Sequence, residues 1–307
     1  MVSRCVLASA GLVADRLLGE PPSLLHPVVG FGRVMRAVER SMYRDSRMPG
    51  VAHAAIGTGL GVAAGGLVGS TAVATWLAVA GRALGDAATA VGAALDADDL
   101  PLARSLLPGL AGRDPSALNE KEVARAVIES VAENTVDAVV APALWAAVLG
   151  APGTLAYRAV NTLDAMVGHR STRYRHYGWA SARLDDWAGW VPARATAALV
   201  AVVRPGAAGA VWTAVRTQAP AHPSPNAGVA EAAFAAALGL RLGGENRYDD
   251  RVELRPPLGT GRPAEPADIV RAVDLSRDVS LALGAFLVVK SVFSTGITTR
   301  NAPGVQR

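Results

Sequence analysis

The chain has 307 residues, of which 51% are hydrophobic and only 18% are charged, and its mean hydropathy is +0.27. Roughly 25% of the residues are charged in an average soluble domain, so this composition excludes a disordered chain and fits an ordinary soluble enzyme poorly. The formal net charge of +4 comes almost entirely from arginine. Because Cys5 is the only cysteine, an intrachain disulfide and a zinc site built on cysteines are both excluded. These properties predict a membrane protein or a membrane-embedded enzyme.

The first polar segment, residues 14–47, contains Asp15, a stiff proline-rich turn that includes His26, and a row of arginines. From Arg33 to Arg47 these arginines recur at three- or four-residue spacing, which places them along one face of a helix. Two interpretations stay open. The row is either a cytoplasmic flank that follows the positive-inside rule or a binding site for an anionic substrate.

The following segment, Met48 to Gly81, has 34 residues without Asp, Glu, Lys or Arg. A membrane span needs about 20 apolar residues, so this run predicts either one long tilted helix or a tight hairpin broken near Gly65-Gly66. Residues 82–137 are rich in alanine with interspersed charges and predict amphipathic helices.

The end of that helical region, Asn119 to Asp137, places Glu129, Glu133 and Asp137 at successive four-residue intervals on one helical face. Like charges at this spacing repel each other by a few tenths of a kcal/mol per pair. A cation would remove the repulsion, and carboxylates on a rigid helix suit Mg²⁺ bound together with phosphates. The alternative is a solvated acidic face. The helix leads directly into an apolar run, which places its end at a membrane boundary.

This second apolar run, Ala138 to Tyr157, contains Pro142 and Pro152, which membrane helices tolerate when neighbours satisfy the freed backbone groups. Two weaker apolar segments follow nearer the C-terminus, and they predict either buried helices or re-entrant segments. They are Trp187 to Val215 and Val279 to Thr299.

Between these runs, the polar segment 158–186 carries amide, basic and acidic groups in that order. Asn161 and Asp164 share one helical face, and a short basic cluster with interleaved tyrosines follows. A nucleic-acid site could show this pattern, but the cluster is short and lies between apolar segments. Phosphate binding is the simpler interpretation, because the planar donor fork of arginine matches phosphate oxygens. Asp185 and Asp186 come next and predict either metal ligands or an exposed acidic pair near a helix start.

The last polar segment, residues 216–278, is rich in proline and glycine. Its most ordered part reads HPSPNAGVAE from His222 to Glu231, where two prolines exclude a helix and hold Asn226 in a defined loop. A plain loop leading into a helix would explain the same pattern. Classical nucleotide-binding and hydrolase motifs are absent from the sequence.

Taken in order, these motifs resemble the CobD/CbiB family of cobalamin biosynthesis, adenosylcobinamide-phosphate synthase. The resemblance covers nearly the whole chain, and so many short motifs in one order rarely coincide. The motifs are DxxxGEPP with HPV (15–28), ARS (103–105), GRD (112–114), ESVAENTVD (129–137), YRAVNTLDAMVG (157–168), GWASARLDD (178–186), PAR (192–194), HPSPNAG with Glu231, and LGG (242–244).

The resemblance implies an all-α, multi-pass protein of the cell membrane. Residues 1–307 are expected to form one membrane-embedded domain, in which the polar segments are 14–47, 82–137, 158–186 and 216–278. It implies an ATP-dependent ligase that joins the ring D propionate of adenosylcobyric acid to aminopropanol or its O-phosphate through an amide bond. ATP and Mg²⁺ are the expected cosubstrate and metal, and the corrinoid is a substrate. Membrane lipids and other cobalamin-assembly enzymes are the expected partners, and no nucleic acid is expected.

The residues that match the motifs then receive expected roles. The expected metal ligands are Glu129, Glu133, Asp137, Asp185 and Asp186. The expected phosphate- and substrate-binding residues are Arg113, Arg170, Arg173, Arg183, Asn134, Asn161 and Asp164. The expected catalytic residues are His26, His222, Asp15, Asn226 and Glu231, with one of the two histidines as the general base toward the attacking ammonium.

Topology adds a further expectation. Because ATP is cytoplasmic, the polar segments 14–47, 82–137 and 158–186 must share the cytoplasmic side if they form one site. We therefore expect Met48–Gly81 and Ala138–Tyr157 to be hairpins or re-entrant segments, or one of them to be buried without crossing. Two other classes of protein stay open: a membrane scaffold for corrinoid-handling enzymes, and a small transporter, which would carry its charges within the spans.

Overall fold

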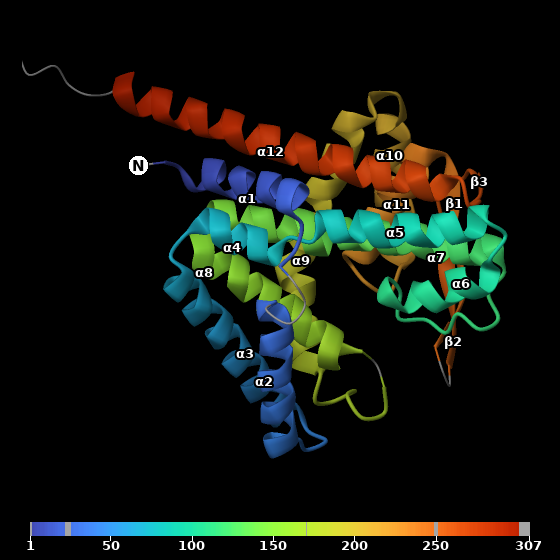
Figure 1. The fold of residues 1–307 in the computed structure, drawn as a ribbon, viewed down its shortest axis with the longest axis horizontal. Helices are drawn as coiled ribbons and strands as arrows, with labels where there is room; N and C mark the ends of the chain where they lie inside the picture. Colours follow the sequence, from blue (N-terminus) through green and yellow to red (C-terminus); the bar gives the residue numbers. More distant parts are fainter. Residues whose placement is uncertain (1, 22–25, 170, 249–250, 301–307) are drawn as a thin grey trace, which may run out of the picture.

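The computed structural model describes residues 2–21, 26–169, 171–248 and 251–300. Helices make up most of the described chain, as predicted. They are arranged around two central helices, α7 (Glu120–Thr135) and α8 (Ala141–Leu163) (Figure 1). The helices are α1 (Arg4–Leu18), α2 (Pro27–Met42), α3 (Arg47–Val68), α4 (Thr71–Ala78), α5 (Gly81–Asp96), α6 (Leu100–Leu106), α7 (Glu120–Thr135), α8 (Ala141–Leu163), α9 (Trp179–Val203), α10 (Ala208–Thr217), α11 (Ala227–Leu238) and α12 (Asp268–Arg300). Shorter helical turns are η1 (Leu107–Gly109), η2 (Val136–Val140), η3 (Asp164–Gly168), η4 (Pro205–Ala207) and η5 (Ala219–Ala221).

A small sheet lies beside α7 and α11 and was not predicted from the sequence. Its strands are β1 (Leu240–Tyr248), β2 (Arg251–Leu258) and β3 (Arg262–Pro263), in the order β2-β1-β3. β1 pairs antiparallel with β2 and parallel with β3, and its register shifts between Leu242 and Gly244. Gly243 and Gly244 take positive φ angles of 84° and 110° at this irregularity, a conformation that glycine adopts without steric cost.

The first apolar run, Met48 to Gly81, forms a helical hairpin, which is one of the two predicted alternatives. Helix α3 ends at Gly69, whose φ of 65° is left-handed, and α4 begins at Thr71. The chain then returns along the central helices, so that the N–H of Ala80 donates to the carbonyl of Ala138 at 2.9 Å. The predicted break at Gly65-Gly66 is wrong, because α3 continues through both glycines.

The second apolar run is also a hairpin. α7, η2 and α8 form a continuous helical stretch, Glu120–Gly168, of 49 residues, yet Gly150 inside it has a φ of 71° and a ψ of −155°. Beyond that residue the chain reverses, because Thr154 Oγ1 donates to the carbonyl of Pro142 at 2.7 Å and Asn161 reaches Asp137. A straight helix would hold Thr154 and Pro142 about 18 Å apart. The expectation of a hairpin for Ala138–Tyr157 is therefore confirmed.

The two hairpins pack through glycines of α3. A Cβ atom added at Gly61 or Gly65 would lie within 2.8 Å of the backbone of the returning arm of α8, near Leu155 and Ala151. Small residues allow such close approach of helix backbones, as in membrane proteins. Gly65 is thus used for packing, while Gly69 makes the turn.

Two described helical stretches, Arg47–Val68 and Glu120–Gly168, are long and apolar enough to cross a membrane. A third exists only if Trp179–Val203 and Pro205–Ala221, which meet at a bend of 113°, count as one span. Both hairpin turns lie at the same end of the molecule, on the left in Figure 1, near the C-terminal half of α12. Exposed apolar side chains such as Leu67 (89% exposed), Leu149 and Phe293 gather there.

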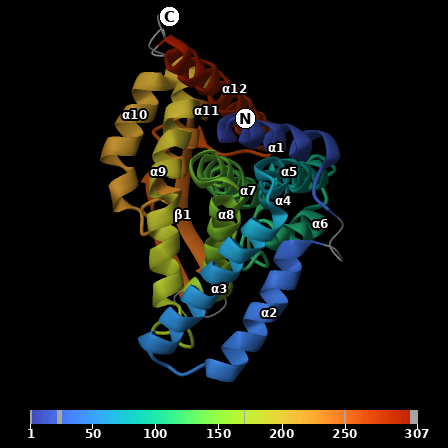
Figure 2. The same ribbon diagram turned by 90° about the vertical axis from the view of Figure 1, so that its left-hand side faces the viewer.

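The opposite end holds most of the polar segment 82–137 and the sheet, whereas α2, from the segment 14–47, lies beside α3 at the bottom of Figure 1. α5, α6, the start of α7 and the sheet lie on the right in Figure 1, and α9, α10 and α11 cover the other side of the central helices (Figure 2). A continuous buried core of alanine, valine and leucine joins α5, α7, α9, α11 and α12. The start of α12 is fixed by Asp268, whose carboxylate is bound by Arg262 at 2.7 and 2.9 Å and by Arg271 at 2.6 Å.

Candidate active site

An acidic cluster lies where the two arms of the second hairpin meet α9. The side-chain amide of Asn161 donates to Asp137 Oδ2 at 3.1 Å and to Asp185 Oδ1 at 3.3 Å, so a single amide bridges two carboxylates from distant segments. The hydroxyl of Tyr157 lies 3.5 Å from Asp137 Oδ1. Asp164 is close enough to both aspartates to interact electrostatically. The structure thus brings Asp137, Asn161, Asp164 and Asp185 together.

Two π-helical turns place acidic residues in this cluster. Asp137 lies in η2 and Asp164 in η3, the turns that flank α8 at its two ends. π-helical turns interrupt the ordinary helical period and occur frequently at functional sites. The carboxylates are half-buried, which leaves them accessible to a ligand.

Metal binding was expected at five acidic residues. In the part of the chain that the structure describes, no three His, Cys, Asp or Glu side chains form a group that could hold a metal ion by themselves. Mg²⁺, however, is usually bound through one or two carboxylates together with substrate phosphates. The pair Asp137 and Asp185, with the amide of Asn161 between them, fits that requirement.

A cavity of about 580 Å³ adjoins the cluster. Helix α9 contributes to both places. Asp185 contacts Asn161 in the cluster, and the next residue, Asp186, lines the cavity. The charged and imidazole side chains that line the cavity are mainly basic, and they come from α9, from the loop that precedes it and from the loop before α11. They are His169, Arg175, Arg183, Asp186, Arg194 and His222.

The loop before α11 is joined to α9 by Asn226. Its amide nitrogen donates to the carbonyl of Asp186 at 2.9 Å, and its amide oxygen accepts from Arg194 at 3.1 Å. Asn226 is buried, so both ends of its amide are used to fix this wall of the cavity.

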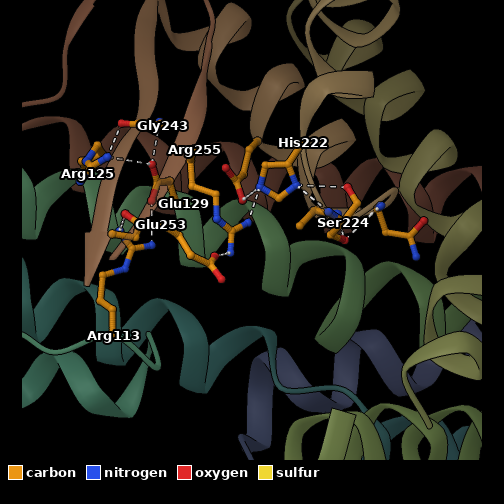
Figure 3. A network of polar contacts seen from close by, with 12 residues as sticks. Arg113, Arg125, Glu129, His222, Ser224, Gly243, Glu253 and Arg255 are labelled. Atoms are coloured by element: carbon orange, nitrogen blue, oxygen red, sulfur yellow. Dashed lines mark hydrogen bonds and ion pairs between the residues drawn. The ribbon is translucent and has the colours of Figure 1, made fainter. Parts of the chain in front are cut away.

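His222 lies at the boundary between the cavity and a buried network of charges (Figure 3). Its Nε2 atom is 2.8 Å from Nη1 of Arg255 and 3.7 Å from Oε1 of Glu231, and its Nδ1 is 3.1 Å from the carbonyl of Ser224. A guanidinium only donates hydrogen bonds. Nε2 therefore presents its lone pair to Arg255, while Nδ1 lies 3.1 Å from both the carbonyl and the N–H of Ser224.

Burial shifts the pKa values of His222 and Glu231 in opposite directions. Burial lowers the pKa of His222, and the positive charge of Arg255 lowers it further. Burial raises the pKa of Glu231 well above its usual range, and the negative charges of Glu129 and Glu133 add to that effect.

The network continues to Glu129, which the structure does not bring to the aspartate cluster. Its Oε2 accepts from Arg113 at 2.7 Å and its Oε1 accepts from the N–H of Gly243 at 2.8 Å. Arg113 also donates to Asn246, and Arg125 donates to the carbonyl of Gly243 (Figure 3). Glu129 and Arg113 thus join α7 to the irregular part of β1. Glu133, by contrast, is exposed on the same helix and is close enough to Asp137 and Arg255 to interact electrostatically.

Arg173 connects α2 with the loop residues 171–178. It donates to the buried carboxylate of Glu39 at 3.1 Å, and its guanidinium lies 4.1 Å from the ring centre of Tyr43. Tyr174 also donates to Glu39, at 2.9 Å. The loop that carries His169 and Arg175 to the cavity is therefore fixed at its base.

The remaining expected site residues lie elsewhere. Nδ1 of His26 accepts from the N–H of Val28 at 3.2 Å and caps α2. Asn134 donates to the carbonyl of Ser130 within its own helix at 2.9 Å. Asp15 accepts from the N–H of Arg82 at 3.1 Å. Arg170 lies outside the described residues.

Several residues of the site were not singled out from the sequence. Arg194 was recognised only as part of a motif, and Arg255 was taken as part of a loop. The alternation of Glu253 and Arg255 with apolar neighbours is the two-residue period of a strand, and it was the available signal for β2. Tyr157 was also recognised only as part of a motif, because its contact with Asp137 depends on the chain reversal at Gly150.

Comparison with known proteins gives one family throughout. The sequence profile of the CobD/Cbib protein family matches residues 8–276 of the chain. The cobalamin biosynthesis protein CobD of Mycobacterium tuberculosis is 48% identical over 95% of this chain and 96% of its own length. Proteins of the same name from Chromobacterium violaceum and Rhodobacter capsulatus are 45% and 41% identical over 86% and 91% of this chain, which is 89% and 96% of their own lengths. No solved structure matches the chain.

Proposed function

The chain belongs to the CobD/CbiB family of cobalamin biosynthesis, and from that premise we propose that it is an ATP-dependent ligase of the cell membrane. Its reaction joins the ring D propionate of adenosylcobyric acid to aminopropanol or aminopropanol O-phosphate. One amide bond forms, and ATP is consumed. The observation that carries this proposal is the position of Asp137 and Asp185 beside a cavity lined by arginines and His222.

Activation of the carboxylate is the first requirement. A carboxylate does not react with an amine at neutral pH, so the γ-phosphoryl group of ATP must first pass to a propionate oxygen and form an acyl phosphate. Bound Mg²⁺ would neutralise the phosphate oxygens during this transfer. Asp137 and Asp185 would hold it, with the amide of Asn161 keeping their oxygens together.

The arginines of the cavity suit the phosphoryl group itself. Arg183 lies 3.7 Å from Asp186 and has a mostly exposed side chain, so its guanidinium is able to turn toward a ligand. Arg175 and Arg194 line the same cavity. Guanidinium groups bind phosphate oxygens through two parallel hydrogen bonds and stabilise charge that develops in the transition state.

The amine must lose a proton before or during its attack on the acyl phosphate. His222 is the candidate base, and its Nε2 atom faces Arg255 at 2.8 Å. The imidazole becomes available as a base when Arg255 moves toward another anion. An incoming carboxylate or phosphate is such an anion, so substrate binding would release the base only when the site is loaded. Attack of the amine on the acyl carbon breaks the bond to the phosphate oxygen, and inorganic phosphate leaves as the amide forms.

The assay that tests the proposal uses purified protein in detergent, with ATP, Mg²⁺, adenosylcobyric acid and aminopropanol phosphate. We expect corrinoid amide and ADP to form in equal amounts. Asp185→Asn should reduce amide formation to background, whereas Glu120→Gln should keep full activity. Glu120 is exposed at the first turn of α7, far along the chain from the cluster, and makes a matched carboxylate control.

Two outcomes would overturn the proposal. A protein that binds corrinoid but consumes no ATP with any amine would be a scaffold. Full activity in Asp185→Asn would leave the ligase reaction standing but remove the acidic cluster from its mechanism.

A further inference from the structure

Arg194 is the arginine of the 580 Å³ cavity whose guanidinium is held in place by its neighbours. Its Nη1 atom donates to the carbonyl of Trp190 at 3.1 Å and to Oδ1 of Asn226 at 3.1 Å. Its guanidinium carbon also lies 4.4 Å from the ring centre of Trp190, within the range of a cation–π contact. Arg175 and Arg183, the other arginines of the cavity, are exposed.

The guanidinium of Arg194 keeps donors for a ligand. A guanidinium has five N–H groups, and Nη1 uses its two in the contacts with Trp190 and Asn226. Among the described residues, no acceptor binds Nε or Nη2, and no carboxylate forms an ion pair with Arg194, whereas Arg183 pairs with Asp186 at 3.7 Å. Neither Nε nor Nη2 is a buried polar atom, so a ligand in the cavity can reach both. Together they form the donor fork that matches two phosphate oxygens.

Asn226 sets the position of this guanidinium along α9. Its Nδ2 atom donates to the carbonyl of Asp186 at 2.9 Å, while its Oδ1 atom accepts from Arg194, so a single amide brings the guanidinium back toward Asp186. Because a guanidinium only donates and a carbonyl only accepts, the amide cannot turn over without losing both hydrogen bonds. Gly189 leaves room for this contact, since a Cβ atom there would lie 2.6 Å from Nδ2 of Asn226.

The same arrangement brings a positive charge toward the acidic cluster. Side chains of a helix lean toward its N-terminus, and Arg194 follows this direction as it approaches Asp186. The residue before Asp186 is Asp185, whose Oδ1 atom accepts from Asn161 in the cluster. A chain of phosphates that extends from a cation at Asp185 into the cavity therefore meets the donor fork of Arg194.

We propose that Arg194 binds a phosphoryl group of a polyphosphate through its Nε and Nη2 atoms, and that Asn226 is the positioning residue that holds Arg194 for this contact. The identity of the polyphosphate as ATP rests on the proposed function. Arg183 must turn toward the ligand, whereas Arg194 is already in place. A group that is fixed before binding loses less conformational entropy, so Arg194 should contribute more to the affinity than Arg183.

Binding of inorganic triphosphate tests this proposal without any turnover. We would measure its affinity for the detergent-purified chain by isothermal titration calorimetry in the presence of Mg²⁺. Arg194→Ala should weaken binding about thirtyfold, as expected for the loss of hydrogen bonds to a charged group. Arg194→Lys keeps the charge without the planar fork and should recover only part of the affinity. Arg216→Ala removes an exposed arginine of α10 that does not line the cavity, and this matched control should change the affinity less than about twofold.

A double-mutant cycle separates positioning from a merely structural role of Asn226. Asn226→Ala should weaken triphosphate binding about fivefold when Arg194 is present, the loss expected for one hydrogen bond. It should cause no further loss in the Arg194→Ala background, because two residues that act through one contact are not additive. Equal losses in both backgrounds would overturn the positioning role. If Asn226→Ala does not fold, Gly189→Ala, which displaces the same amide, takes its place in the cycle.

Three results would overturn the anion site: no binding of triphosphate to the unmodified chain, unchanged affinity in Arg194→Ala, or a larger loss in Arg183→Ala than in Arg194→Ala. Failure of the proposed function looks different. A chain that binds triphosphate through Arg194 but forms no amide would refute the ligase and keep the site. A ligase whose triphosphate affinity does not depend on Arg194 would keep the reaction and refute the site.

Discussion

Replacing Asn161 by aspartate tests directly whether Asp137 and Asp185 hold a cation. The Nδ2 atom of Asn161 donates to one oxygen of each carboxylate, at 3.1 and 3.3 Å. Asn161→Asp keeps the shape of the side chain, removes both hydrogen bonds and places a third carboxylate between the first two. Asn161→Leu removes the same hydrogen bonds without adding charge, and it serves as the reference.

The geometry sets the size of the effect. At the 3.1 Å between Asn161 and Asp137, two unit charges repel by about 5 kcal/mol at an effective dielectric constant of about 20. The folded protein can avoid this repulsion by binding a proton. For a carboxyl group with an ordinary pKa of about 3.9, protonation at pH 7 costs roughly 4 kcal/mol. Because this cost is smaller than the repulsion, it sets the upper limit of the destabilisation. With a chelator present, we expect the free energy of unfolding of Asn161→Asp to be about 4 kcal/mol lower than that of Asn161→Leu. This difference corresponds to a melting temperature that is roughly 8 °C lower.

Excess Mg²⁺ should reverse that order. The third carboxylate is then a further oxygen ligand, whereas leucine offers none. Thermal unfolding of both variants in detergent, with EDTA and with Mg²⁺, measures the two orders. If Asn161→Asp is the less stable variant in both buffers by the same margin, no cation binds between these carboxylates, and the metal assignment is refuted.

Three other predictions concern phosphate binding, the start of α12 and topology. Arg183→Ala should raise the KM for the phosphorylated amine more than the KM for the corrinoid, with only partial recovery in Arg183→Lys; equal increases would indicate a folding defect. Burial would raise the pKa of Asp268, but Arg262 and Arg271 hold it below the usual value, so its stabilisation is present above pH 3.8 and is lost as the pH falls further. Asp268→Asn should lower the free energy of unfolding by about 3 kcal/mol at pH 7 and flatten the acid limb of a denaturation series. In a Cys5→Ser background, Ala97→Cys and Thr172→Cys should react with an impermeant maleimide only after cells are opened; labelling of either one in intact cells contradicts a shared cytoplasmic side.

The apolar hairpins were accessible from the sequence because long charge-free runs containing glycine and proline have few alternatives. Which glycine makes the turn was not accessible. Gly65 and Gly69 both lie in the first run, but Gly65 faces the backbone of Ala151 and Pro152 and is needed for packing. Only Gly69, at the end of α3, takes a left-handed conformation. The choice depends on a contact with residues more than eighty positions away in the chain.

The acidic residues show the same limit. The four-residue spacing of Glu129, Glu133 and Asp137 correctly placed them on one helix, and their common role as metal ligands stays a prediction. In the structure their partners come from different segments: Glu129 binds Arg113 and the bulged strand β1, while Asp137 meets Asn161 and Asp185. Helical periodicity identifies a face, but it does not say which parts of a face meet which neighbour. The strands were missed for a related reason, since their glycines and prolines indicate loops unless the pairing partner is known.

The two hairpins also explain how an apolar chain can present one polar site. Each apolar run leaves the polar end, turns at Gly69 or Gly150 and comes back, so its flanking segments lie on the same side. Crossing the bilayer once with Met48–Gly81 would separate the arginines of 14–47 from the carboxylates of 82–137. Returning instead keeps both next to 158–186, where Asp137, Asn161 and Asp185 are already in contact. The proposed reaction, which would use cytoplasmic ATP, requires this arrangement, and the glycines with positive φ at the two turns allow the chain to adopt it.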